Sequence, residues 1–144
     1  MRSFLIAIAL ILSATFAHAD EILTPADIEK VSELRGVQFI DINSNSRTDT
    51  MNFTDAKGNV FLKVDFMPPD YFDTWKSNME DSSELVSGIG EAALRNKEDG
   101  PLNQISFKKG EYTVALTAMI YKDLKPALSV AQLTELAKLA AERM

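Results

Sequence analysis

The sequence predicts an α+β domain in which helices flank a mostly antiparallel sheet, an α/β sandwich. Short β-prone segments follow one another at the spacing of hairpins, with turn residues between them. Strong helix starts lie near both ends of the chain, and a third helical pattern interrupts the strands. Helices that flank runs of antiparallel strands are typical of α+β folds.

The strands are predicted from alternating apolar and polar residues. In Val60–Met67, for example, Val60, Leu62, Val64 and Phe66 share one face. The turn Asp55–Asn59 has a glycine that can take positive φ, so the strands on either side of it should form a hairpin. The predicted strands are Val37–Ile42, Thr50–Thr54, Val60–Met67, Ala92–Arg95, Leu102–Phe107 and Tyr112–Ile120.

The predicted helices begin with recognisable capping chemistry. Thr24 and Asp27 form a capping-box pattern around Pro25, which suits the first helical position. The same logic recurs from Ser129 to Gln132 at the start of the last helix. Gly36 should end the first helix, and Asp70–Met79 should form the middle one.

The N-terminus has the pattern of a cleavable export signal. Arg2 precedes the apolar run Phe4–Leu12, and Ala17-His18-Ala19 offers a small-x-small cleavage site. We therefore expect a signal peptide over residues 1–19 and a single α+β domain over residues 20–144. The protein should work in the periplasm or outside the cell, as a soluble domain without a membrane span.

Composition excludes several classes of function. The sequence has no Cys, and its one His lies in the predicted signal, so the expected mature chain lacks the residues of Ser-His triads, Cys nucleophiles and nearly all zinc sites. Without Arg2 the chain has 14 basic and 21 acidic residues, a net charge of −7. An acidic domain repels phosphate backbones, so nucleic acid is not an expected partner. No cofactor is expected.

One polar segment has part of a calcium-loop pattern. Side-chain oxygens recur there at alternate positions, as in an EF-hand loop, but Ser46 and Asn52 replace the required Gly and Glu. A simple polar hairpin loop is the alternative. The candidate metal ligands are Asp41, Asn43, Asn45 and Asp49.

Aromatic residues in the middle helix are candidates for ligand binding. Tyr71, Phe72 and Trp75 follow Pro68-Pro69 and could line a groove. Aromatic residues at helical spacing more often belong to a core. Farther along, Gly88-Ile89-Gly90 partly matches a phosphate-binding loop, and the alternative there is a turn with unusual backbone angles.

Three stretches carry a resemblance to a known family. They are Val86-Ser-Gly-Ile-Gly-Glu-Ala-Ala, Ile105-Ser-Phe-Lys-Lys-Gly-Glu-Tyr-Thr-Val-Ala-Leu and Leu133-Thr-Glu-Leu-Ala-Lys-Leu-Ala. Together they are similar to small exported bacterial domains that resemble the PsbP-like α/β sandwich. The likeness covers about Val86 to Met144 and carries no catalytic residues over. It implies binding or accessory work at the cell envelope.

The sequence thus favours a non-enzymatic exported binding or accessory domain, whose partner is an unknown small ligand or envelope protein. One alternative is a calcium-stabilised module or cation-dependent hydrolase that uses the polar loop. Another is a secreted enzyme inhibitor that presents a rigid, protruding loop such as Asn96–Pro101.

Overall fold

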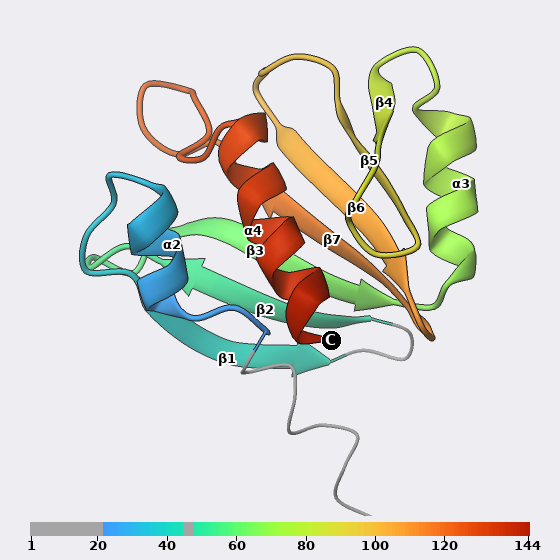
Figure 1. The fold of residues 1–144 in the computed structure, drawn as a ribbon. Coiled ribbons are helices and arrows are strands. Elements are labelled where there is room, and N and C mark those ends of the chain that lie inside the picture. The colour runs from blue at the N-terminus through green and yellow to red at the C-terminus, as the bar shows by residue number, and fades with distance from the viewer. Residues whose placement is uncertain (1–21, 45–47) are drawn as a thin grey trace, which may run out of the picture.

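A computed structural model describes residues 22–44 and 48–144, with the backbone alone for residues 41–44. Within these residues, strands form one antiparallel sheet in the order β1-β2-β3-β7-β6-β5-β4 (Figure 1). The prediction of an α+β fold with a mostly antiparallel sheet is confirmed. The strands are β1 (Gln38–Ser44), β2 (Asp49–Thr54), β3 (Val60–Met67), β4 (Ser83–Val86), β5 (Ala92–Asn96), β6 (Asn103–Lys109) and β7 (Tyr112–Ala118).

The predicted hairpins form, and β3 has the predicted bounds. Leu62, Val64 and Phe66 are buried in the main core, as the alternation of the strand requires. One strand, β4, was not predicted. Its four residues, Ser-Glu-Leu-Val, lie in an acidic, serine-rich segment that lacks an alternating pattern, and pairing with β5 holds them in the sheet.

Both predicted capping boxes are present. In α2 (Pro25–Val31) the Thr24 side chain accepts a hydrogen bond from the Asp27 backbone N–H, and the Asp27 carboxylate accepts one from the Thr24 N–H. Ser129 and Gln132 repeat this exchange at the start of α4 (Val130–Arg143). The prediction that Gly36 ends the first helix is wrong. The helix stops at Ser32, whose backbone is extended and whose hydroxyl donates to the Ile28 carbonyl.

The long helix α4 crosses one face of the sheet over β5, β6 and β7, and α2 packs beside it (Figure 1). Arg143 near the end of α4 forms a salt bridge of 2.6 Å with Asp27, which lowers the pKa of that carboxyl. Arg143 also donates to the Ile22 carbonyl, so the first and last parts of the described chain are tied together. The apolar stripe of α4 is buried as predicted: Val130, Leu133, Leu136, Ala137 and Ala140.

The middle helix α3 (Asp70–Asn78) lies toward the β4 side of the molecule (Figure 1). It contacts β6 and β7, and Phe72 is its buried residue. The Thr113 hydroxyl donates to the Pro69 carbonyl at the start of this helix. Because Thr113 precedes the core residue Val114 in β7, this contact is made from the strand's other face.

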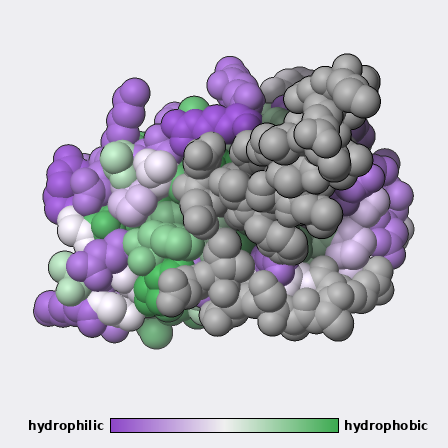
Figure 2. Space-filling model, turned by 90° about the horizontal axis from the view of Figure 1, so that it is seen from below, coloured by the Kyte–Doolittle hydropathy of each residue, from purple (hydrophilic) through white to green (hydrophobic). Residues whose placement is uncertain are grey.

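None of the helices in the described ranges is long and apolar enough to cross a membrane. The predicted signal peptide, residues 1–19, lies outside the described residues. At the edge of the sheet, β1 exposes Phe39 and Ile40. Seen from below, hydrophobic side chains gather next to the residues drawn in grey, with hydrophilic ones around them (Figure 2).

Candidate functional site

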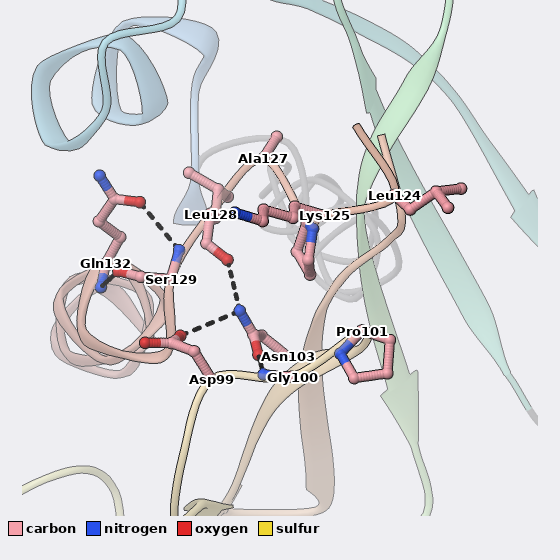
Figure 3. A pocket seen from close by; sticks show the side chains of 11 residues that line it. Asp99, Gly100, Pro101, Asn103, Leu124, Lys125, Ala127, Leu128, Ser129 and Gln132 are labelled. Carbon is pink, nitrogen blue, oxygen red and sulfur yellow. Dashed lines mark hydrogen bonds between the residues drawn. The ribbon is translucent and has the colours of Figure 1, made fainter. Parts of the chain in front are cut away.

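A cleft of about 640 Å³ opens at the end of the sheet where β5 turns into β6 and β7 leads into α4. Two loops that are distant in sequence form it (Figure 3). We call it the loop cleft. It is lined by Asp99, Gly100, Pro101, Asn103, Leu124, Lys125, Pro126, Ala127, Leu128, Ser129 and Gln132.

A hydrogen-bond network around Asn103 braces the loop cleft (Figure 3). The Asn103 amide nitrogen donates to Asp99 Oδ1 at 3.1 Å and to the Leu128 carbonyl at 2.9 Å. Its amide oxygen accepts from the Gly100 N–H at 2.9 Å. Asp99 Oδ1 also accepts from the Val130 N–H at 2.7 Å, at the start of α4. Because Asn103 is buried and links both loops, the lining of the loop cleft is held in one arrangement.

A tight turn over residues 122–125 forms the outer wall of the loop cleft. The Lys125 N–H donates to the Lys122 carbonyl at 3.0 Å, and the Tyr121 N–H donates to the Lys125 carbonyl at 2.8 Å. Asp123 and Leu124 between them have φ of 54° and 57°. Positive φ at both central residues is the type I′ geometry, which normally takes Asn-Gly or Gly-Gly. Leucine is disfavoured there, because its Cβ crowds the following carbonyl.

The turn presents Leu124 to solvent. The residue is 80% exposed, and its side chain lies at the outer edge of the loop cleft, directed away from Asn103 and Leu128 (Figure 3). Leu102 and Ile120 are each 51% exposed and flank the same two loops. A backbone conformation that leucine avoids, combined with an exposed side chain, marks a candidate recognition element.

The turn is anchored by Tyr121, whose hydroxyl donates a hydrogen bond to the Asp55 carboxylate in the β2–β3 turn. Hydrogen bonds from the Asn59 amide and from Tyr121 hold the pKa of Asp55 well below its usual range. The same bond to Asp55 raises the pKa of Tyr121 above that of a free tyrosine. Lys122 folds back over the Tyr121 ring, with its Nζ 5.1 Å from the ring centroid.

The predicted ligand-binding aromatics lie elsewhere. Tyr71, Phe72 and Trp75 are on α3, and none of them lines the loop cleft. Phe72 is buried against the sheet, which fits the core alternative, whereas Tyr71 and Trp75 are half-buried. Their role as ligand contacts stays a prediction.

The predicted metal ligands fall in the β1–β2 hairpin. Asp41 and Asn43 belong to β1 and Asp49 begins β2, with Ser44 paired to Asp49. Strand β1 thus extends past the predicted end at Ile42, because pairing with β2 continues to Ser44. Asn45 lies outside the described residues, as do the side chains of Asp41 and Asn43. The calcium site stays a prediction.

The two glycines of Gly88-Ile89-Gly90 serve a turn. Both have positive φ, and a Cβ on Gly90 would lie 2.5 Å from the Lys108 carbonyl oxygen. Ile89 between them is buried in the core. Close backbone approach to β6 therefore accounts for glycine at position 90.

No protein-family model, no curated protein and no solved structure matches this chain.

The sequence predicts a loop tip at Asn96–Pro101. It does not predict that this loop and the turn over residues 122–125 line one cleft. The sequence feature that points to this turn is Leu124, because it is an apolar residue among charged ones in a loop without glycine. Leu124 is a candidate recognition residue because its backbone is left-handed. Tertiary contacts such as the Tyr121–Asp55 hydrogen bond hold the backbone in that conformation, and they are not visible in the sequence.

Proposed function

We propose that this protein is an exported, non-enzymatic binding or accessory domain that acts in the periplasm or outside the cell. We further propose an α/β-sandwich arrangement similar to that of PsbP-like domains. Its partner is a small ligand or an envelope protein that contacts the loop cleft and the turn over residues 122–125.

The observation that carries this proposal is the presentation of Leu124. A solvent-facing leucine in a left-handed turn costs free energy that a surface loop without a binding role would avoid by using glycine or asparagine. Leu102 and Ile120, next to the same two loops, are exposed as well. Exposed apolar surface near a braced cleft is typical of recognition sites.

The polar lining also favours recognition over chemistry. Asp99 Oδ1 accepts from Val130 and Asn103, and the Asn103 amide is used on both its oxygen and its nitrogen. Ser129 and Gln132 are occupied with each other in the capping box. Catalytic acids and bases need to reach a substrate, whereas the side chains of Asn103, Ser129 and Gln132 and one carboxylate oxygen of Asp99 are engaged in these local hydrogen bonds.

A secreted inhibitor is the second candidate, and one observation favours it. The loop that contains Asp99 is held by Asn103 and by the start of α4, which gives it the rigidity that an inhibitory loop needs. In that case the partner would be a secreted hydrolase that receives residues 96–101.

Photocrosslinking in the exporting cell tests the proposal. A photoreactive benzoylphenylalanine replaces Leu102, which borders the loop cleft, and in a second variant it replaces Leu85. Leu85 is 62% exposed in β4 and serves as the matched control. We expect adducts with a ligand or another envelope protein from position 102 and none of the same mass from position 85.

Equal adducts at both positions would mean non-specific contact and would count against a binding site at the loop cleft. An adduct between position 102 and a secreted hydrolase would select the inhibitor candidate. The absence of any adduct at position 102 would contradict both.

A further inference from the structure

We infer that a second copy of this chain docks on the loop cleft, with Leu124 of each copy inserted into the loop cleft of the other about a two-fold axis. The inference rests on the proposal that the loop cleft is a binding surface, and it adds the identity of one partner. The occupant follows from the shape and the charges of the two walls of the loop cleft.

The first argument is the adjacency of an apolar knob and a hole. Leu124 is 80% exposed at the rim, and Pro101, Pro126 and Ala127 line the loop cleft beside it. A two-fold interface uses the same patch on both copies, so it must contain its own complement. A knob next to a hole meets this condition, because one rotation places each knob over the partner's hole.

The second argument is charge. One wall, the turn over residues 122–125, has Lys122 and Lys125, and no salt bridge within the described chain engages either lysine. On the opposite side Asp99 lines the loop cleft, and with its exposed neighbours Glu98 and Lys97 it gives this segment a net charge of −1. A two-fold rotation that exchanges the knobs also brings the lysine-bearing wall of one copy against the acidic wall of the other. Asp123 is the one acidic residue within the turn, so the turn as a whole keeps a net positive charge.

The third argument is preorganisation. The Asp55–Tyr121 hydrogen bond and the Ile120–Pro126 bridge fix the base of the turn. Leu124 is thus held in its exposed position before a partner arrives, which reduces the entropy lost on binding. The surface is small, and interfaces below about 1,200 Å² are typical of weak, transient association.

Sedimentation equilibrium of the exported protein tests the inference at total concentrations from about 1 to 500 µM, the range that suits such a weak interface. We expect the mass to rise from one copy toward two. Leu124→Asn keeps a residue that tolerates the left-handed backbone and should weaken the dimer about tenfold or more, because a buried leucine is lost from each copy. Leu85→Asn, at an exposed leucine on β4, should leave the association unchanged.

Charge reversal gives a readout that an unfolded variant cannot mimic. Lys125→Glu and Glu98→Lys should each weaken the dimer by about threefold or more, because each brings like charges together. Combining both changes in one chain, or mixing the two single variants, should restore association.

A protein that stays monomeric at the highest concentration would overturn the inference. So would a dimer that is indifferent to Leu124→Asn, or one that charge reversal weakens without rescue by the complementary change. If the protein is monomeric but crosslinks from position 102 to another molecule, the inference fails and the proposed function stands.

Discussion

The β2–β3 turn and the turn over residues 122–125, which we call the β7–α4 turn, are linked by the Tyr121–Asp55 hydrogen bond. They differ in the residues that adopt positive φ. In the first, Gly58 takes φ of 87° without strain, and the Asp55 carboxylate accepts from the Lys57 and Asn59 N–H groups. The second has positive φ at two residues with side chains, Asp123 and Leu124.

The difference distinguishes a turn that serves only the fold from a neighbouring turn that we propose also serves binding. The β2–β3 turn follows the local rules, so its sequence predicts its shape and needs no role beyond closing a hairpin. The β7–α4 turn breaks them and is held in place by its neighbours, including Asp55. Violations of local preference that the surroundings stabilise tend to mark functional sites.

Removing the carboxylate of Asp55 should have the largest effect on stability, because it supports both turns at once. Asp55→Ala leaves Tyr121, Asn59 and Lys57 without their shared acceptor. We expect the melting temperature to fall by more than in any other single variant of the two turns. Asp55→Asn, which keeps one acceptor oxygen, should lose less.

The same bond predicts the pH dependence of stability. The pKa of Asp55 is lower in the folded state, so its contribution is present above the unfolded value of about 3.9 and declines as pH falls below it. The pKa of Tyr121 is raised, so its contribution declines as pH rises above about 10. Asp55→Asn should flatten both the acid and the alkaline limb of the stability curve. Tyr121→Phe should remove the alkaline limb and reduce the acid limb in part, because Tyr121 is one of the donors that lower the pKa of Asp55. Unchanged slopes in thermal melts would contradict the linkage.

The next effect concerns the glycine of the ordinary turn. Gly58→Ala should lower the free energy of unfolding by about 1 kcal/mol, because alanine disfavours the left-handed region. Gly100 is the matched control, since its φ lies outside that region and no atom lies within 4 Å of an added Cβ. Urea denaturation should show a change within about 0.5 kcal/mol for Gly100→Ala. Equal losses at both positions would mean that φ does not decide the outcome.

The smallest effect has the opposite sign. Leu124→Asn should raise the free energy of unfolding by about 0.5 to 1 kcal/mol, because asparagine tolerates the left-handed region better than leucine. Urea denaturation must be performed at a concentration where the protein is monomeric, so that loss of the proposed dimer does not mask the gain. A loss of stability in this variant would show that Leu124 supports the fold.

Local chemistry let the sequence predict much of the fold. Thr24 with Asp27, and Ser129 with Gln132, define their helix starts within four residues, and the alternation in Val60–Met67 defines β3. Strand β4 was not predicted because its sequence has no strand pattern of its own. It is a strand because it pairs with β5. The loop cleft was also not predicted, since Asn103 and Leu128 meet only in the folded chain.

The strand order also determines where ordering the chain is most costly. Strands β1 to β3 and strands β4 to β7 each form a run of neighbouring hairpins, and each run ends at the centre of the sheet. Within a run the connections are short, so bringing strands together closes only small loops. The two runs meet at a single ladder, β3 with β7, which closes a loop containing α3, β4, β5 and β6. The largest single loop-closure cost in the sheet therefore belongs to that one central pairing.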